Sequence, residues 1–498
     1  MENLMRYLCN LFIALLLILP ITVQASNLSN VTETSNWTDL SNYTNLNNAT
    51  ELGPFGTAGA PTTDLIGIAG ELGFGVGVAS TLPTGMTALT GTTDTESDEY
   101  GNYQFEDGSI MVYVPKAYYK VGTGLNGFAV NVIDVKGIDT YATTALANAA
   151  GYALHRAFID GGSEKKGFFF DKYEASKNAK GTGFVASSIK NGLPISTNAA
   201  HNPISDLTAV TVNQYYSTVD AAHARDGANG AVNPDSIFSV GTMYQYSALA
   251  MLSMAHGQAA NDATNCAWYD VAGNTNFPKG NNNNALKDVN DTSVVWESDG
   301  YSNAGKTGSA GYGGGAGNEF AKSAHNGQIN GIVDLSGNLY EVSLGLTRDG
   351  ANSDFYSLKE SVAAKNMTSG YGGATDWWGD TTSLANTHDV LSAAHITNAS
   401  AWERFGNGEN QVLSAATSGE GWLLTGLGLP LAQTAQSAVG TNLFGTDGLY
   451  EYWRAQLCPV VGGHWRDSTY AGVWMRNLGD YRSNSYAHVG FRCACYFD

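Results

Sequence analysis

The chain has 498 residues, which is enough for two to four domains of ordinary size. Charged residues make up only 14% of it and the formal net charge is -20, so its surface repels phosphate backbones and we expect no nucleic-acid partner. Glycine fills 60 positions against 11 for proline, which favours short strands and many turns over long helices.

Residues 1–25 are predicted to be a secretory signal peptide. An apolar run from Leu11 to Ile21 follows Arg6, and Val23-Gln24-Ala25 is a small-x-small cleavage pattern. The run is short for a membrane span, which needs about 20 residues. An uncleaved N-terminal anchor is the alternative. We therefore expect a secreted or cell-surface protein with no transmembrane segment after signal removal.

Residues 26–52 form a predicted Asn/Thr-rich stalk or linker. The segment contains five N-x-S/T sequons, which begin at Asn27, Asn30, Asn36, Asn42 and Asn48. In a host that glycosylates, this pattern indicates a sugar-bearing stalk. A flexible polar linker is the equally weighted alternative.

Residues 53–99 are rich in Gly, Ala and Thr, and the acidic stretch Asp94–Glu99 is interpreted as the boundary before one large α+β domain at residues 100–498. Within that domain the apolar patterns predict two strands, a buried helix, a long loop, a turn and a loop-rich stretch. These elements are expected at Ser109–Pro115, Gly167–Glu174, Ser236–His256, Asn274–Gly317, Gly331–Val342 and Leu358–Leu449 respectively.

Four cysteines remain after the signal, at Cys266, Cys458, Cys493 and Cys495. In an exported chain they are candidates for disulfides, with three connectivities open. Cys493 and Cys495 are too close along one strand to bridge easily to each other. A zinc site is the weaker interpretation, because C-x-C is not the usual ligand spacing.

Four segments, in order, resemble motifs of the formylglycine-generating-enzyme (sulfatase-modifying factor) branch of the C-type-lectin fold. The opening strand Ser109–Pro115, the Phe169–Glu174 strand, the Gly331–Val342 turn, and the closing Gly462–Trp465 and Gly490–Arg492 each resemble one motif. The resemblance spans roughly residues 105–495 and implies an α+β C-type-lectin-like domain. We expect its matching residues Asp334, Asn338, Glu341, Gly490 and Arg492 to be structural frame.

The catalytic chemistry of that family does not accompany the motifs. The generating enzymes carry two copper-binding cysteines a few residues after the G-G-S-x motif, where this chain has Arg466–Val473 without a cysteine. No H-x-x-x-H pair suggests the iron site of a related branch. We therefore expect no catalytic residue, no metal site and no cofactor, apart from structural calcium that the fold often carries. A formylglycine-generating-type oxidase is the alternative.

The segment Gly462–Arg492 resembles the variable region of diversity-generating-retroelement target proteins, in which a reverse transcriptase rewrites adenines in a C-terminal cassette. The residues that match the family's constant frame include Trp465, Val473, Leu478, Gly490, Phe491 and Arg492. Most residues between them are reachable from an Asn codon by changing adenines. The resemblance implies that these interposed residues bind ligand: His464, Arg466, Asp467, Tyr470, Gly479, Asp480, Tyr481, Ser485, Tyr486, Ala487 and His488.

The chemistry of the interposed residues agrees with a binding face, because Tyr, Arg, His, Asp and Ser combine rigid aromatic contacts with adaptable hydrogen bonds. The sequence therefore predicts a non-enzymatic protein that binds a protein or cell-surface ligand, with homo-oligomers open because family members can trimerise. A viral tail-fibre adhesin on a virion surface and an inert matrix protein are the remaining alternatives.

Overall fold

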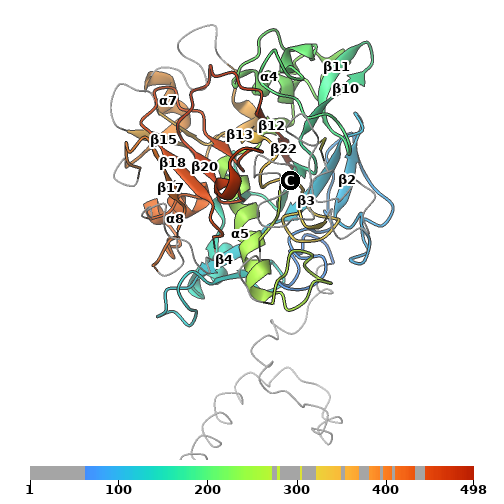
Figure 1. Cartoon of the computed structure of the whole chain (residues 1–498). Helices are drawn as coiled ribbons and strands as arrows, with labels where there is room; N and C mark the ends of the chain where they lie inside the picture. Colours follow the sequence, from blue (N-terminus) through green and yellow to red (C-terminus); the bar gives the residue numbers. More distant parts are fainter. Residues whose placement is uncertain are drawn as a thin grey trace, which may run out of the picture. The chain divides into compact units, whose positions relative to one another are not determined.

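The computed structural model describes residues 62–271, 277–280, 303–304, 321–348, 354–369, 381–392, 396–406, 410–431 and 444–497. Over these residues the protein is mixed α/β, with many short strands and few helices, which agrees with the coarse α+β prediction (Figure 1). The predicted signal and stalk, and most of the predicted loop at 274–317, lie outside them. Within the described ranges, no helix has the length and apolar character needed to cross a bilayer.

The first six-stranded sheet is antiparallel throughout and holds the predicted strands. Its inner strands are buried on both faces, as expected for the apolar sequences IMVYVP and GFFFD. The strand order is β1 (Met86–Ala88), β2 (Asn102–Phe105), β3 (Ile110–Pro115), β9 (Gly167–Asp171), β22 (Cys493–Tyr496) and β12 (Phe238–Val240). The strand predictions at 109–115 and 167–174 are confirmed, the second with its turn after Asp171.

The second six-stranded sheet is mixed, because β13 pairs in parallel with β21 and β18 in parallel with β20. Its strands come from distant parts of the chain, in the order β17 (Ala401–Arg404), β18 (Gly448–Glu451), β20 (Arg476–Asn477), β19 (Val460–Val461), β13 (Tyr340–Val342) and β21 (Val489–Gly490). The predicted variable region thus begins after β19, supplies β20 and β21, and leads directly into β22 of the first sheet.

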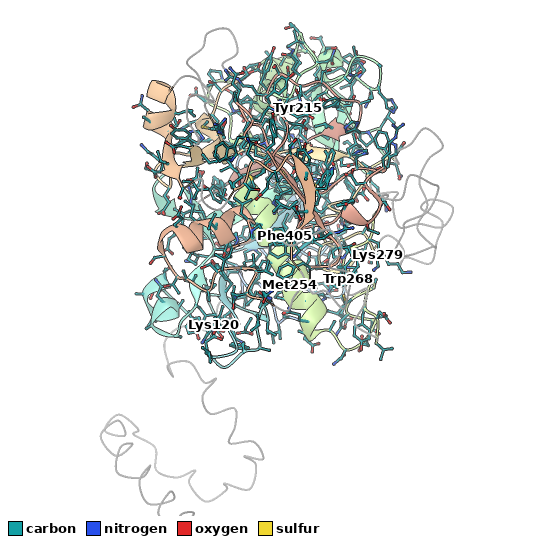
Figure 2. The ribbon with its side chains drawn as sticks, turned by 60° about the vertical axis from the view of Figure 1, so that its left-hand side comes forward. Lys120, Tyr215, Met254, Trp268, Lys279 and Phe405 are labelled. Carbon is teal, nitrogen blue, oxygen red and sulfur yellow. The ribbon has the colours of Figure 1, made fainter. Side chains whose placement is uncertain are left out.

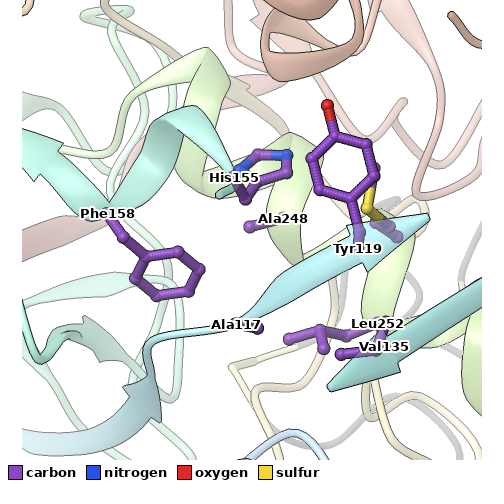
Figure 3. A pocket seen from close by; sticks show the side chains of 8 residues that line it. Ala117, Tyr119, Val135, His155, Phe158, Ala248 and Leu252 are labelled. Carbon is purple, nitrogen blue, oxygen red and sulfur yellow. The ribbon is translucent and has the colours of Figure 1, made fainter. Parts of the chain in front are cut away.

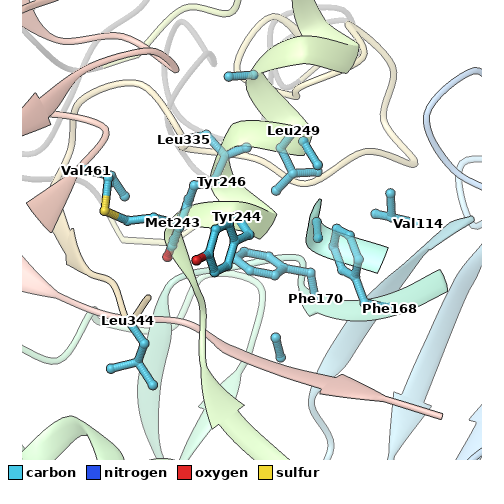
Figure 4. Packing of buried hydrophobic residues seen from close by; sticks show 14 of the residues in the cluster. Val114, Phe168, Phe170, Met243, Tyr244, Tyr246, Leu249, Leu335, Leu344 and Val461 are labelled. Carbon is cyan, nitrogen blue, oxygen red and sulfur yellow. The ribbon is translucent and has the colours of Figure 1, made fainter. Parts of the chain in front are cut away.

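The helix α5 (Met243–Ala259) confirms the helix predicted within residues 236–256. Thr242 Oγ1 accepts from the Gln245 N–H, and Gln245 Oε1 accepts in turn from the Thr242 N–H, which completes a capping box. Almost every residue of the helix is buried, which explains why its sequence has no polar face. In Figure 1 α5 runs between the strands of the two sheets, and Figure 4 shows Tyr246 and Phe170 among the packed side chains.

Smaller sheets and short helices complete the fold around this centre. The remaining strands are β4 (Tyr118–Val121), β5 (Ile133–Lys136), β6 (Ala153–Leu154), β7 (Ile159–Asp160), β8 (Ser163–Glu164), β10 (Ala175–Lys180), β11 (Gly183–Ser188), β14 (Leu346–Thr347), β15 (Phe355–Leu358) and β16 (His388–Leu391). The other helices are α3 (Thr144–Ala149), α4 (Ser217–His223), α7 (Thr381–Thr387) and α8 (Gly419–Leu427).

Two sequence expectations differ from this architecture. The acidic stretch 94–99 is not a boundary in space, because Ile66, Phe74 and Val76 are buried in the same core and β1 pairs with β2. The stretch 358–449 carries more regular structure than predicted, namely β16, β17, α7 and α8. Its strands are short and lack clear alternation of apolar and polar residues, so periodicity could not reveal them.

The four cysteines that were candidates for disulfides are all free and buried. Cys493 and Cys495 lie on β22 in the middle of the first sheet, while Cys266 and Cys458 lie in other parts of the core. None of the three connectivities left open by the sequence is formed in this structure. Burial raises the pKa of each thiol, so all four behave as small apolar side chains.

Candidate ligand-binding face

A buried charge network lies beneath the predicted binding segment. Arg492 Nε donates to Glu341 Oε1 at 2.7 Å, and its other nitrogens donate to the carbonyls of Lys172 at 2.8 Å and Val333 at 2.6 Å. The hydroxyl of Tyr246 on α5 donates to the second oxygen of Glu341. Burial raises the pKa of Glu341, and Arg492 opposes that shift. This network joins α5, β13 and the link from β21 to β22.

A second buried carboxylate fixes the turn before β13. Glu174 accepts hydrogen bonds from the Asn338 side chain and from the backbone N–H of Leu339 at 3.2 Å. Asp334 and Asn338 both have positive φ, at 60° and 62°, as tight turns require. The predicted frame residues Asp334, Asn338 and Glu341 are therefore buried and structural in position, and Glu174 is a frame residue that the sequence motif contained but did not single out.

A second charge pair holds β22 in place. Arg225, just after α4, binds Asp171 in a bidentate arrangement with distances of 2.5 and 2.8 Å, and Asp171 also accepts from the backbone N–H of Cys493 at 2.8 Å. All of these groups are fully buried. Sequence reasoning missed Arg225, because an isolated arginine 54 residues from its partner gives no local signal.

The predicted frame residues of the variable region are also buried. They are Trp465, Val473, Leu478, Gly490, Phe491 and Arg492. Trp474, Met475 and Arg476, which the sequence pattern did not place in the frame, are equally buried. Buried side chains therefore support the surface of the segment 462–492, most of them in the main core and Trp465 in a separate cluster with Leu339.

The predicted ligand-binding residues divide by exposure. Arg466 is exposed, and the rings of Tyr481 and Tyr486 are 39% and 42% exposed. Partly exposed side chains form the larger group: Asp467, Tyr470, Asp480, Ser485, Ala487 and His488. His464 and Gly479 are buried, which corrects the expectation that they lie on the surface.

Stacked rings explain the burial of His464. The ring centroids of Tyr486 and His488 lie 5.1 Å apart, and those of His488 and His464 lie 4.3 Å apart, both in stacked geometry. Tyr340 on β13 meets His464 edge-on at 4.8 Å. The exposed Tyr486 is thus the outer end of a stack whose inner end reaches the second sheet. Such a stack holds the exposed ring rigidly, which lowers the entropic cost of binding.

Gly479 is buried for a different reason. A Cβ at this position would lie 2.5 Å from the Tyr450 ring, so any side chain there would displace the ring. The backbone of Gly479 is also engaged, because its N–H donates to Asn477 Oδ1 at 2.7 Å and its carbonyl accepts from Arg454 Nε at 2.8 Å. Gly479 therefore shapes the loop rather than contacting a ligand.

A second group of rings on β17 and β18 lies beside the segment and was missed by sequence reasoning. Trp402 lies 5.3 Å from Tyr450 and 5.1 Å from Tyr470 by ring centroids, and the Arg404 guanidinium lies 4.0 Å over Tyr470. These rings are partly exposed. Because they come from residues outside 462–492, no variable-region pattern could have indicated them.

Asp480 is held by polar contacts from another element. Its carboxylate accepts from the Tyr215 hydroxyl at 3.1 Å and from the Asn484 side chain at 2.8 Å. The Tyr215 ring also meets Tyr486 edge-on at 6.3 Å. Figure 2 shows Tyr215 at the end of the molecule opposite Lys120. The loop 480–486 is therefore braced from beneath by the segment before α4.

Burial sets the charge of the face near neutral pH. It lowers the pKa of His488 to about 4 and that of His464 to about 2, with the two rings and Arg466 adding mutual repulsion. It raises the pKa of Asp467 to about 6, and hydrogen bonds from Tyr340 and the His464 backbone oppose that shift. The stacked imidazoles are consequently neutral near pH 7.

The cavities found in the described structure lie elsewhere. One small apolar cavity lies between β4, β5 and α5 and is lined in part by Tyr119, His155 and Phe158 (Figure 3). Tyr119 Oη and His155 Nε2 have no hydrogen-bond partner there. Within the described ranges, no group of three or more His, Cys, Asp or Glu side chains has the arrangement of a metal site.

Over the described residues, the candidate site is thus a surface of stacked rings, arginines and short polar side chains over a buried charged frame. Comparison with known proteins adds no family to this description, since no protein-family model matches the chain and no curated protein matches it.

Proposed function

We propose that this protein is a non-enzymatic binding protein and that the segment 462–492, together with its neighbouring strands, forms its ligand-binding face. The supporting observation is the separation of roles within the segment. Its exposed side chains, led by Arg466, Tyr481 and Tyr486, are of the types that dominate protein recognition sites. Its buried side chains join the core. A rigid support with adaptable surface residues fits a binding function.

We further propose that the scaffold is a C-type-lectin-like domain of the formylglycine-generating type, displayed outside the cell. What supports it is that three of the four motif segments meet in space around two carboxylates. Glu174 and Glu341 connect the Phe169–Glu174 segment, the Gly331–Val342 turn and the closing Gly490–Arg492 segment through the hydrogen bonds described above. Motifs that lie more than 300 residues apart thus share one structural role.

The position of the thiols supports binding over oxidase chemistry. An oxidase of the generating-enzyme type needs ionised cysteines near its substrate. Here Cys493 and Cys495 lie inside the first sheet, and burial raises the pKa of both thiols. Protonated, inaccessible thiols are poor metal ligands and poor nucleophiles.

The proposed function predicts that the exposed positions accept substitution and the frame does not. Replacing Tyr481, Tyr486 or Arg466 by Ala is expected to lower the melting temperature by no more than a few degrees, since such changes cost about 0.5 kcal/mol or less. Replacing Leu478 or Phe491 by Ala is expected to cost about 3 kcal/mol. Thermal unfolding measures both. Equal losses in the two groups would contradict a surface built for diversity.

A display library tests binding itself. Residues 466, 481, 485, 486 and 487 are randomised, and clones are selected for an arbitrary target such as lysozyme. A matched control library randomises Lys177, Ala179 and Phe184 on the β10–β11 hairpin. Specific binders are expected from the first library at far higher frequency than from the second. Equal frequencies of specific binders from the two libraries would show that the proposed face binds targets no better than the hairpin surface does.

The proposed retroelement origin has a separate test in the codons for residues 462–492. Sequencing many natural copies of the gene is expected to show adenine-directed variation at the codons for Arg466, Tyr481 and Tyr486. The codons for Trp465 and Phe491 are expected to stay constant. If the codons at the exposed positions do not vary, the proposed retroelement origin is wrong, and the proposed binding function is unaffected.

A further inference from the structure

Arg454 stands out among the arginines near the binding face. It follows β18, outside the segment 462–492, and is partly exposed. Its guanidinium lies 4.4 Å from the ring centroid of Tyr452 and 5.4 Å from that of Tyr481, and its Nε donates to the carbonyl of Gly479 at 2.8 Å. Two rings and one hydrogen bond therefore fix its orientation.

The outer end of this fixed guanidinium is unused. Within the described structure, the two terminal nitrogens of Arg454 donate no hydrogen bond, and no carboxylate forms an ion pair with it. Two buried arginines differ in this respect, because Asp171 occupies the fork of Arg225 and Glu341 binds Arg492. An oriented, unoccupied planar fork suits bidentate binding of a carboxylate.

The local charge favours an acidic ligand. Asp480, a nearby carboxylate, has both oxygens engaged by Tyr215 and Asn484; burial raises its pKa, and those hydrogen bonds and the charge of Arg454 oppose that shift. Arg466, on the segment 462–492, is a second cation and is exposed. One partly exposed and one exposed guanidinium thus belong to the proposed face and its flank, in a chain whose net charge is -20. The overall negative charge meanwhile repels extended polyanions such as nucleic acids.

The shape of the surface favours a protein as the source of the carboxylate. Small ligands bind in concave pockets, whereas the cavities found in the described structure are lined by other segments. The arginine instead lies against the partly exposed ring of Tyr452 and the exposed ring of Tyr481, and the ring of Tyr486 on the same segment as Tyr481 is also exposed. Such a surface fits a protein loop or extended segment.

We propose that Arg454 is a constant anchor of the binding face and pairs with an Asp or Glu side chain of a protein partner. This inference rests on the proposed function and adds the chemistry of the ligand. Because Arg454 lies outside 462–492, changes within that segment would alter the contacts around the anchor and leave the anchor in place. The repertoire of partners is then biased towards acidic epitopes.

A peptide library measures this bias. The full chain is used to select from a phage-displayed library of random dodecapeptides. Enriched peptides are expected to contain a recurrent Asp or Glu. R454A is expected to weaken the binding of such a peptide at least tenfold, and the peptide's own Glu→Gln or Asp→Asn change is expected to do the same. The two changes together should weaken binding no further than either alone, since both remove one contact.

Two further variants distinguish the contribution of the planar guanidinium from the contribution of positive charge alone. R454K keeps the charge but lacks the planar fork, and it is expected to weaken binding at least threefold. K177A removes an exposed cation from β10 and is expected to keep affinity within twofold of the parent chain. Equal melting temperatures of the parent chain and R454A show that the loop carrying Gly479 remains folded.

Each contrary result has a distinct meaning. The anchor proposal is overturned if the enriched peptides lack acidic residues. It is also overturned if the loss of binding free energy in the double change equals the sum of the losses in the two single changes. If Y481A and Y486A abolish peptide binding and R454A does not, the anchor fails while the binding face stands. If selected peptides are insensitive to all three changes, the proposed face itself fails. Binding of sialylated but not desialylated oligosaccharides on an array, without acidic peptides, would overturn the choice of a protein partner.

Discussion

At the scale of single residues, the stacked imidazoles of the proposed binding face make the stability of the fold depend on pH. The pKa of His488 falls from its ordinary value of 6.5 to about 4 on burial, so the folded state favours the neutral ring. The unfolded chain therefore binds the proton first as pH falls. The stability that the neutral ring contributes is fully present above pH 6.5 and is lost as pH falls towards 4.

We therefore expect H488Q to be less sensitive to acid than the parent chain. Between pH 7.5 and pH 5 the parent should lose about 1 kcal/mol more stability than the variant, a value reduced for the partial exposure of the ring. Urea unfolding at the two pH values measures the difference, in which contributions of unchanged groups cancel. An identical loss in both chains would show that the ring is protonated in the folded state.

Tyr119 provides a residue-scale prediction away from the face. Its buried hydroxyl has no hydrogen-bond partner in the described structure, so its desolvation is uncompensated. Y119F is expected to leave stability unchanged or to raise it by up to about 1 kcal/mol. The matched control is Y246F, which removes a donor to buried Glu341 and is expected to cost about 1.5–3 kcal/mol. Similar losses for both variants would contradict the assignment.

At the scale of elements, Arg492 joins three of them. Its side chain bonds to Glu341 on β13, to the carbonyls that follow β9, and through Glu341 to Tyr246 on α5. R492A leaves Glu341 buried without its partner, which is expected to cost about 3–5 kcal/mol. Denaturant unfolding measures the loss.

The double variant R492M/E341Q supplies the control for that prediction. The double variant has no buried carboxylate without a partner, so that source of instability is absent. It is therefore expected to regain at least half of the stability that R492A loses. If the double variant is less stable than R492A, the attraction between the two charges outweighs the free-energy cost of desolvating them.

The elements also show how far sequence reasoning reached. β3, β9 and α5 were predictable, because each is a continuous apolar segment whose length distinguishes strand from helix. β17 and β18 were not, since AWER and GLYE are short and acquire their strand form from each other. At the site, the pattern predicted the frame but placed His464 on the surface. Its burial depends on Tyr340, which is distant in sequence and whose contact no local pattern reveals.

At the scale of the whole molecule, the core holds its thiols without cross-links. Cys266, Cys458, Cys493 and Cys495 are free and buried, so the melting temperature is expected to be the same with and without a reducing agent. A thiol reagent is expected to leave all four unmodified in the native protein and to modify them after denaturation. Mass spectrometry of alkylated peptides measures this, and a cystine-linked peptide in the native protein would refute it.

The position of β22 has a consequence for biosynthesis. This strand lies between β9 and β12 in the first sheet, and Asp171 bonds to Cys493 across 322 residues of chain. The sheet therefore cannot close until the ribosome has translated the whole segment 462–492. A nonsense codon or frameshift within that segment deprives β9 and β12 of their shared neighbour and exposes two unpaired strand edges, which favour aggregation. Only a chain translated in frame through this segment can therefore close the first sheet.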